Sequence, residues 1–420
     1  MSSSDARSEV VAAVASSQDS LVADARRLIA AASPNPPGDV AAAAAVAADL
    51  LAAIPGALVR RYESAPGIVN LVAVIESGRP GRRLCFNGHL DTFPIGEDLG
   101  WTVPPLGGDV RDGRLYGRGV SDMKGGITAS LLAARALASR ADAWSGQIVI
   151  TLAGDEENMG SLGSRWLLEQ VPDARADVML SGDVGSPRVI RFGEKGLVWV
   201  DIEASGTPAH GAHVHKGINA IDRLRGALDE LKGLENIPVA APDPVTRAIA
   251  AARDVSEALS GNGESDTLQR VTVNIGVIEG GVSPNLVPAS ARAKADIRVP
   301  VGVSSTDIED GLESRLGSLA GITWRIVNRY EPSFTPPEHE IVQRTLTAAA
   351  EVLGDSPVTN MTVGASDARI YRMFGIPSVV FGCTPFNMGA ADENVLLDEL
   401  LAVAQVHALT AFDYLSAGTE

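Results

Sequence analysis

Short apolar segments alternate along the first half of the chain with longer segments of helical periodicity. Residues 68–75, 83–87 and 147–153 are rich in apolar and β-branched side chains, whereas residues 125–138 carry apolar side chains at helical spacing. Strands that alternate with helices of about 10–15 residues are typical of a sheet with parallel character. The pattern therefore predicts an α/β fold, in which helices flank a mixed, mostly parallel sheet.

Two helices are expected before the first strand. Residues 19–32 and 39–53 are apolar at helical spacing, and Pro34, Pro36 and Pro37 fall between them. Proline interrupts a helix because it lacks the backbone N–H and clashes with the preceding turn. We expect the break between the two helices at these prolines.

The pattern changes near Gly193 and returns to its first form near residue 333. The intervening segments follow the order β-α-β-β-α-β, which is typical of a small α+β domain with a four-stranded antiparallel sheet. We therefore predict one α/β domain, residues 1–193 and 333–420, interrupted by an inserted domain at residues 194–332. The expected elements of the insertion are strands at 197–204, 271–278, 290–299 and 323–329, and helices at 218–232 and 306–316.

The charge of the chain restricts its partners. Among 420 residues, 35 Lys and Arg face 52 Asp and Glu, which gives a net charge of −17. Nucleic acids and anionic membranes bind clustered basic residues, so we expect neither as a partner. Metal cations favour carboxylate-rich sites and remain compatible with this composition.

The two cysteines and the N-terminal segment bear on the cellular compartment of the protein. Cys85 and Cys383 cannot build a disulfide framework, and such usage fits a reducing environment. Residues 1–16 lack the basic and apolar regions of a secretory signal, and apolar stretches such as 40–53 are too short and polar to span a membrane. We expect a cytoplasmic protein.

Ionisable side chains follow several of the predicted strands where each strand ends. His89 and Asp91 come after residues 83–87, and Glu156 and Glu157 come after 147–153. Asp122 lies among glycines between a strand and a helix, and Asp183 follows a strand at 178–181. Each alone has a simpler interpretation, as a loop histidine, a helix N-cap or a solvated acidic turn.

Taken together, these side chains indicate a metal site. In an open α/β sheet, functional residues gather outside the carboxyl ends of the strands. A set of one imidazole and several carboxylates suits zinc, manganese or cobalt. One carboxylate could bind metal while its neighbour moves protons.

The order of these motifs resembles the co-catalytic zinc amidohydrolase and peptidase family, which includes acetylornithine deacetylase, succinyl-diaminopimelate desuccinylase, aminoacylase and glutamate carboxypeptidase. The resemblance covers nearly the whole chain. The segments that carry it are Gly88-His89-Leu90-Asp91, Gly117 to Gly126, Asp155-Glu156-Glu157, His210 to Ile221, Gly280-Gly281 with Asn285, Asp296-Ile297-Arg298, Ala365 to Arg369 and Asp392-Glu393.

The resemblance implies a role for each metal-site residue. His89 and Asp183 would hold a first metal ion, and Asp122 would bridge to a second. Glu157 would bind the second ion, Glu156 would be the general base, and Asp91 would orient His89.

The resemblance also assigns residues of the insertion. His210 would stabilise the oxyanion and contact substrate, and Asn285 and Arg298 would bind substrate, with Arg298 pairing with a carboxylate. Residues 194–332 would then act as a lid and as the dimerisation domain of a homodimer, while residues 1–193 and 333–420 would form the catalytic domain.

One position departs from the family pattern. The family carries a histidine three residues before the Asp-Glu pair, and here that position is Gly389. The usual imidazole of the second metal is therefore missing, although Asn387 or Asp392 could reach toward the site. We expect either one firmly bound ion or a labile pair.

Three functions are compatible with the sequence. The first is metal-dependent hydrolysis of a C–N bond in a small carboxylate-bearing substrate such as an N-acyl amino acid or dipeptide. The second is hydrolytic deamination of an aminobenzoate, as in 5-nitroanthranilate aminohydrolase, an atypical family member, with Phe386 and Met388 beside Gly389 forming an apolar wall. The third is non-catalytic binding on the same fold.

Overall fold

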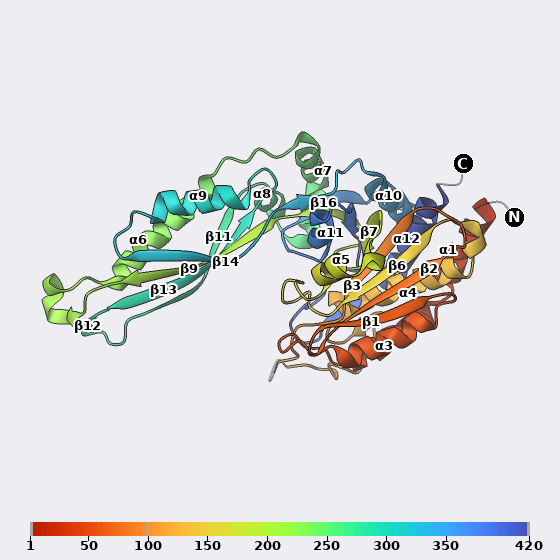
Figure 1. Ribbon diagram of the computed structural model, residues 1–420, viewed down its shortest axis with the longest axis horizontal. Coiled ribbons are helices and arrows are strands. Elements are labelled where there is room, and N and C mark those ends of the chain that lie inside the picture. Colours follow the sequence, from red (N-terminus) through yellow and green to blue (C-terminus); the bar gives the residue numbers. More distant parts are fainter. Residues whose placement is uncertain (1–2, 97–99, 418–420) are drawn as a thin grey trace. The chain divides into compact units, whose positions relative to one another are not determined.

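The computed structural model describes residues 3–96 and 100–417 (Figure 1). The chain divides into two compact units. Unit 1 comprises Met1–Phe192, Phe334–Asn360 and Ser366–Glu420, and unit 2 comprises Gly193–Ser333 and Met361–Ala365.

Unit 1 is built on a mixed sheet to which nine of the described strands contribute. Its centre is parallel: β3 lies between β6 and β7, and β17 extends the parallel set beyond β7. The pairs β1–β2, β2–β6 and β17–β8 are antiparallel. The order along the sheet is β1 (Leu58–Ala65), β2 (Ile68–Glu76), β6 (Gln147–Ala153), β3 (Arg83–His89), β7 (Val178–Ser181), β17 (Ser378–Val380), β8 (Val189–Glu194) and β15 (Ser333–Phe334), with β16 (Val358–Thr362) also paired to β8.

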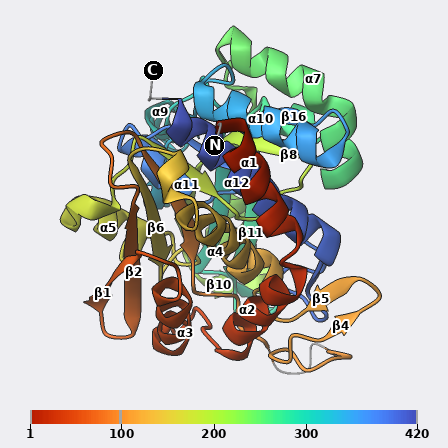
Figure 2. The ribbon, with the colours of Figure 1, turned by 90° about the vertical axis from the view of Figure 1, so that its right-hand side faces the viewer.

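Helices cover both faces of this sheet. Successive side chains of a strand point to opposite faces, and in β3 the Cys85 thiol lies 3.8 Å from the Tyr371 hydroxyl whereas the Phe86 ring stacks on His407. Tyr371 belongs to α11 (Ala368–Met373), which packs beside α5 (Ser164–Gln170), and His407 belongs to α12 (Leu397–Ser416). Around α12 lie α1 (Ser3–Ala15), α4 (Gly125–Ala138) and α10 (Glu340–Leu353), and Figure 2 shows α1, α4 and α12 together. The predicted α/β fold is confirmed.

The prediction of two helices in the first 55 residues is wrong, because the structure has three. Helix α1 precedes α2 (Gln18–Ala30) and α3 (Ala41–Ala52). The buried side chains of α1 are Ala6, Val10 and Val14, one in each turn, and the helix packs on α12. Such a narrow stripe of small side chains, surrounded by Ser, Asp, Arg and Glu, gives little periodic signal in the sequence.

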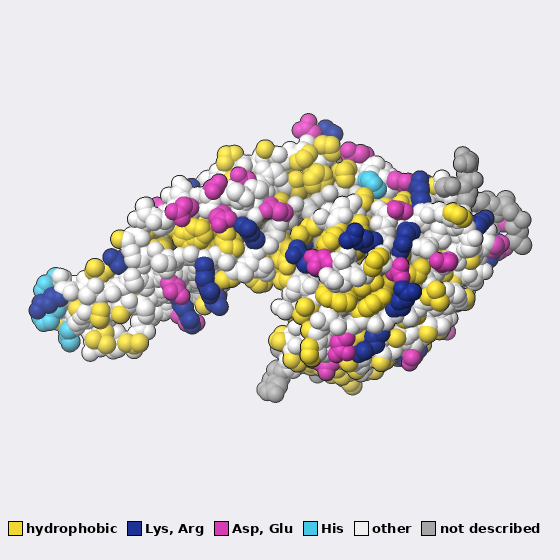
Figure 3. Space-filling model, in the orientation of Figure 1, with side chains coloured by type: hydrophobic (Ala, Val, Ile, Leu, Met, Phe, Trp, Pro, Cys, Tyr) yellow, Lys and Arg dark blue, Asp and Glu magenta, His cyan; other side chains and the backbone are white. Residues whose placement is uncertain are grey.

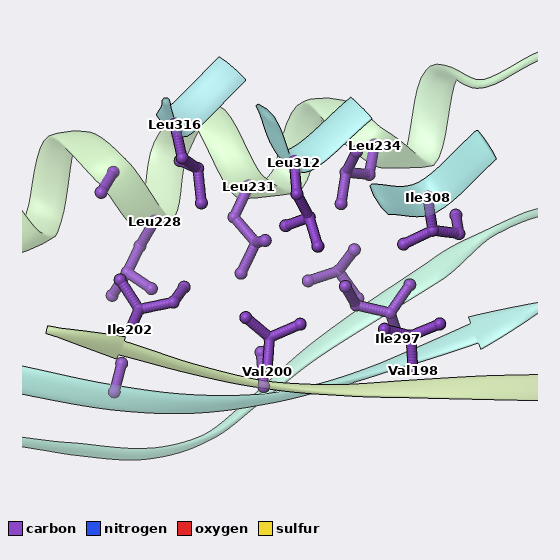
Figure 4. Close-up of a cluster of buried hydrophobic side chains, with 14 of the residues drawn as sticks. Val198, Val200, Ile202, Leu228, Leu231, Leu234, Ile297, Ile308, Leu312 and Leu316 are labelled. Carbon is purple, nitrogen blue, oxygen red and sulfur yellow. The ribbon is translucent and has the colours of Figure 1, made fainter. Parts of the chain in front are cut away.

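Unit 2 contains a four-stranded antiparallel sheet in the order β11-β13-β9-β14. Leucines of α6 and α9 point onto the valines and isoleucines of the strands and form its buried core (Figure 4). The predicted β-α-β-β-α-β order is confirmed. The elements are β9 (Gly196–Ser205), α6 (Ala220–Lys232), α7 (Asp243–Ser260), α8 (Glu264–Leu268), β11 (Thr272–Gly280), β13 (Ser290–Val299), α9 (Ser305–Leu316) and β14 (Ile322–Tyr330).

Two smaller sheets complete the strands. One is formed by β18, β5 and β4, and the other by β10 and β12 of unit 2. Their bounds are β4 (Val110–Arg111), β5 (Arg114–Tyr116), β18 (Asn394–Leu396), β10 (Ala209–His210) and β12 (Leu286–Val287), and the short helical turns are η1 (Val120–Lys124), η2 (Ala141–Ala143), η3 (Pro172–Ala174), η4 (Gly211–Lys216) and η5 (Gly233–Asn236).

No helix within residues 3–96 and 100–417 combines the length and the apolar character that a membrane span requires.

His407 joins elements from both ends of unit 1. Its Nδ1 lies 3.1 Å from the Ser130 hydroxyl of α4, and its Nε2 lies 2.9 Å from the carbonyl oxygen of Phe381. The ring is fully buried, and burial lowers the His407 pKa from 6.5 to about 4. These contacts make His407 a structural residue of unit 1.

We expect His407 to destabilise the fold in acid. Its pKa is lower in the folded chain, so its neutral form contributes stability that is present above pH 6.5 and is lost as the pH falls toward 4, on the order of 3 kcal/mol in total. The measurement is the free energy of unfolding between pH 4 and 7 for the wild type and His407→Gln. The difference between the two should shrink as the pH falls, and a constant difference would contradict the role.

Candidate metal centre

The parallel part of the sheet in unit 1 brings three loops to one edge. Strands β6, β3 and β7 are parallel neighbours, so their carboxyl ends lie side by side. His89 is the last residue of β3, the acidic segment 155–157 follows β6, and Asp183 follows β7. Asp122 comes to the same place from η1, just before α4.

His89, Asp122 and Asp183 form a three-ligand group. One ligand atom from each residue lies within 4.8 Å of the other two. Among the described residues, no other set of three or more His, Cys, Asp or Glu side chains meets this distance. The His89 Nε2 lies 2.9 Å from Asp122 Oδ1 and 4.0 Å from Asp183 Oδ1. An imidazole and two carboxylates suit a divalent transition metal.

Asp91 contacts Nδ1 of His89, the ring nitrogen that is not directed at Asp122. The Nδ1 of His89 lies 2.9 Å from the Asp91 carbonyl oxygen and 3.5 Å from its Oδ1. The buried Asp91 carboxylate also accepts hydrogen bonds from Asn35 and from the backbone amides of Glu156 and Glu157. Burial opposes its ionisation, but His89 and these donors outweigh burial and keep the Asp91 pKa below its usual value. With Nδ1 protonated toward Asp91, Nε2 of His89 is the ligand atom.

The charges of this edge are not balanced by the side chains present. Burial, and then the negative charge of Asp122, raise the Asp183 pKa to about 7 and the Glu157 pKa to about 10. The Oε1 atom of Glu157 is buried and has no hydrogen-bond partner among the described residues. A divalent cation would supply the missing positive charge, so the donor set fits a metal ion.

Glu156 lies beside the group and has a different partner. Its Oε1 is 3.3 Å from Nη1 of Arg369, whose side chain is buried. Burial raises the Glu156 pKa to about 8, while the positive charges of His89 and Arg369 partly offset the rise. A carboxylate with such a pKa can exchange protons near neutral pH.

Two further residues of the site had no role in the sequence analysis. Arg369 contacts Glu156, and Asp367 accepts a 2.6 Å hydrogen bond from Ser164. The second oxygen of Asp367 is buried without a partner among the described residues, and burial raises the pKa of the group. The signal in the sequence that could have indicated these two residues is a pair of opposite charges, Asp367 and Arg369, two positions apart at the start of α11.

The loop around Gly389 supplies no further ligand to the three-ligand group. Gly389 has a φ of +74°, and its carbonyl oxygen accepts a hydrogen bond from Arg118. Asp392 turns to the backbone amide and hydroxyl of Thr102, at 2.8 and 2.9 Å, and Asn387 turns to the Asp392 carbonyl oxygen. The idea that Asn387 or Asp392 reaches the metal site is therefore not supported by their contacts.

The neighbouring Glu393 supports the site although its carboxylate is not part of the three-ligand group. It pairs with Arg118 at 2.6 Å and accepts hydrogen bonds from the amide and hydroxyl of Ser121. Ser121 precedes Asp122, so this buried ion pair fixes the turn that presents Asp122.

The residues expected to bind substrate lie in unit 2. His210 of β10 and Asn285 are neighbours, because Gly211 donates a hydrogen bond to the Asn285 carbonyl oxygen and β10 pairs with β12. Both side chains are exposed. Arg298 lies near the C-terminal end of β13, and its Nε donates a hydrogen bond to Asp296 at 3.0 Å.

Comparison with known proteins identifies the family. Residues 85–413 match the model of peptidase family M20/M25/M40. The chain belongs to this family. A succinyl-diaminopimelate desuccinylase from Parvibaculum lavamentivorans is 30% identical over 361 residues, which cover 82% of each chain.

Solved structures of this family share the fold. A metallo-carboxypeptidase from Sulfolobus solfataricus superimposes with a TM-score of 0.79 at 18% identity, covering 94% of this chain and 99% of the other. A dinuclear metal-binding peptidase from Bacillus subtilis gives a TM-score of 0.63 at 14% identity, covering 95% and 98%. With this membership and a candidate metal site, the family member described here is a metal-dependent hydrolase of amide bonds.

Proposed function

We propose that the chain hydrolyses a C–N bond in a small carboxylate-bearing substrate, such as an N-acyl amino acid or a dipeptide. The observation that carries this proposal is the convergence of His89, Asp122 and Asp183 beside the carboxylate of Glu156. Relatives of the chain are named succinyl-diaminopimelate desuccinylase, so N-succinyl amino acids belong to the same substrate class.

His89, Asp122 and Asp183 would hold the first divalent ion, zinc, manganese or cobalt, and Asp122 and Glu157 would hold a second. Such an ion polarises the scissile carbonyl and makes water more acidic when it is bound. Asp91 keeps His89 oriented for this role. The two carboxylates with strongly raised pKa values, Asp183 and Glu157, become ionised when a cation is present.

Glu156 is the general base in this proposal. It takes a proton from the attacking water and returns it to the leaving nitrogen, which requires a carboxylate that is ionised at the start and basic enough to accept a proton. Arg369 supports the ionised form through its contact with Oε1 of Glu156. Arg369 positions this base from α11.

Unit 2 supplies the groups that would recognise substrate. His210 would stabilise the developing oxyanion, Asn285 would bind the substrate beside it, and Arg298 would pair with the substrate carboxylate. We propose that residues 194–332 act as a lid on a catalytic domain formed by residues 1–193 and 333–420. The same insertion would join two chains in a cytoplasmic homodimer.

We infer one firmly bound ion or a labile pair of ions. The contacts of the loop around Gly389 support this inference, because Asp392 is engaged by Thr102 and Glu393 by Arg118 and Ser121. A second ion that lacks the imidazole would rely on Asp122 and Glu157. Loss of one ligand from such a site weakens metal retention.

A product assay tests the reaction. Purified chain is incubated with N-succinyl and N-acetyl amino acids, dipeptides and aminobenzoates in the presence of Mn²⁺, Co²⁺ or Zn²⁺. We expect release of a carboxylic acid or an amino acid, and a loss of at least about 100-fold in kcat for Glu156→Gln with metal retained, since a general base contributes about 10²–10⁴-fold.

Two outcomes of this assay would contradict the proposal. Release of ammonia from an aminobenzoate would favour the deaminase instead. An absence of turnover with every substrate, with Glu156→Gln behaving as the wild type, would favour a non-catalytic binding protein.

Restoring the missing side chain tests the altered second site. Among the residues that the structure describes, a Cβ atom at Gly389 would meet only Phe93, at 3.7 Å, so there is room for a side chain. We expect Gly389→His to retain a second ion more tightly than the wild type after dialysis. Gly389→Ala is the matched control, because both variants bear the cost of a positive φ, about 1 kcal/mol. Equal metal retention in the two variants would contradict the inference.

A further inference from the structure

Three histidines of unit 2 lie on one exposed turn. His210 precedes η4, and His213 and His215 lie within it, all with exposed side chains. The ring centroids of His210 and His213 are 6.0 Å apart, and those of His213 and His215 are 5.8 Å apart. Figure 3 shows His side chains gathered at the left end of the view, beside a basic side chain. The proposed reaction uses only His210.

These distances are close to those of histidines that share a metal ion. Two imidazoles bound to one ion at about 2.0–2.1 Å have their ring centroids about 5 Å apart in tetrahedral geometry. In each of these two pairs the rings must therefore approach by about 1 Å, which exposed side chains achieve by rotating about their own bonds. The nitrogens of the three rings do not all lie within 4.8 Å of one another, unlike the ligand atoms of His89, Asp122 and Asp183, so this site would form only when the ion arrives.

One hydrogen bond of the turn must be given up before His210 binds an ion. Nδ1 of His210 accepts the backbone N–H of Ala212 at 3.1 Å, so the proton of the neutral ring is on the outward Nε2. An ion on Nε2 requires that proton to move to Nδ1, at the expense of the exposed contact with Ala212. Between the rings stand only Gly211, Ala212 and Val214, and the Val214 side chain is exposed. The next charged side chain along the turn is Lys216, a cation.

The donor set differs from that of the metal centre. Imidazoles without a carboxylate favour Zn²⁺, Ni²⁺ or Cu²⁺, whereas Mn²⁺ prefers oxygen ligands. The neighbouring Lys216 opposes a cation and should make this site weaker than the centre of unit 1.

We propose that His210, His213 and His215 form a second transition-metal site, specific for Zn²⁺, Ni²⁺ or Cu²⁺ and separate from the metal centre. An ion bound there holds Nε2 of His210. Resting on the proposed function, the consequence is that excess Zn²⁺ inhibits the enzyme by withdrawing His210 from the reaction.

Binding is tested first, without any turnover. The untagged full-length chain is loaded with Mn²⁺ at the metal centre and titrated with Ni²⁺ in a calorimeter. The wild type and the control Val214→Ala/Lys216→Ala should bind one more equivalent of Ni²⁺ than His213→Ala/His215→Ala. Since all four side chains are exposed, the three proteins should melt at the same temperature. Equal Ni²⁺ binding by all three would overturn the site.

Inhibition is tested separately. The Zn²⁺ concentration that halves activity should rise at least about tenfold in His213→Ala/His215→Ala, because loss of metal-site partners costs about 10–100-fold in affinity. If Ni²⁺ binding is lost and Zn²⁺ inhibition stays unchanged, the inhibitory role is overturned and the binding site stands. The calorimetric result does not depend on turnover, so it stands or falls independently of the proposed reaction.

Discussion

Negative charge at one edge of a sheet is the constraint on which the rest of unit 1 depends. The parallel strands β6, β3 and β7 end side by side, and each is followed by an ionisable side chain. Asp183, Glu156 and Glu157 have pKa values raised by burial, so ionising all of them without a cation is costly. A divalent cation at this edge would offset that cost.

Residues around this edge of the sheet position His89, Asp122 and Glu156. Asp91 is ionised and satisfied by four contacts, and it orients His89. The buried pair of Arg118 and Glu393 holds the turn before Asp122, and Arg369 holds Glu156. A buried ion pair of this kind fixes geometry more than it adds stability. Asp91 and Glu393, which are engaged by other side chains and by backbone amides, thus help to place His89 and Asp122.

The sequence predicted the parts of this arrangement that depend on local pattern. The helix at residues 125–138 and the strands at 147–153 and 178–181 were predicted at their observed bounds. Once these strands were predicted, the sequence also placed the ionisable residues that follow them at the strand ends. Helix α1 was missed because its buried stripe is narrow, and β8 was missed because its six buried residues include Arg191 and Glu194.

Other features depend on contacts between distant segments. The hydrogen bonds of Asp392 with Thr102 and of Glu393 with Ser121 join residues about 270–290 positions apart, which no local pattern encodes. The same is true of Arg369 beside Glu156. The neighbourhood of His210 and Asn285 depends on strands of two residues, which are too short to be read from periodicity.

The most direct test of this account is a calorimetric titration of the metal-free chain with Mn²⁺ near pH 6.5, in buffers of different ionisation enthalpy. Because Asp183, Glu156 and Glu157 hold protons more strongly than usual without a cation, binding should release protons. We predict net proton release together with either one tight step of one ion per chain or weak binding of a pair of ions. Two equally tight steps, or binding without proton release, would contradict it.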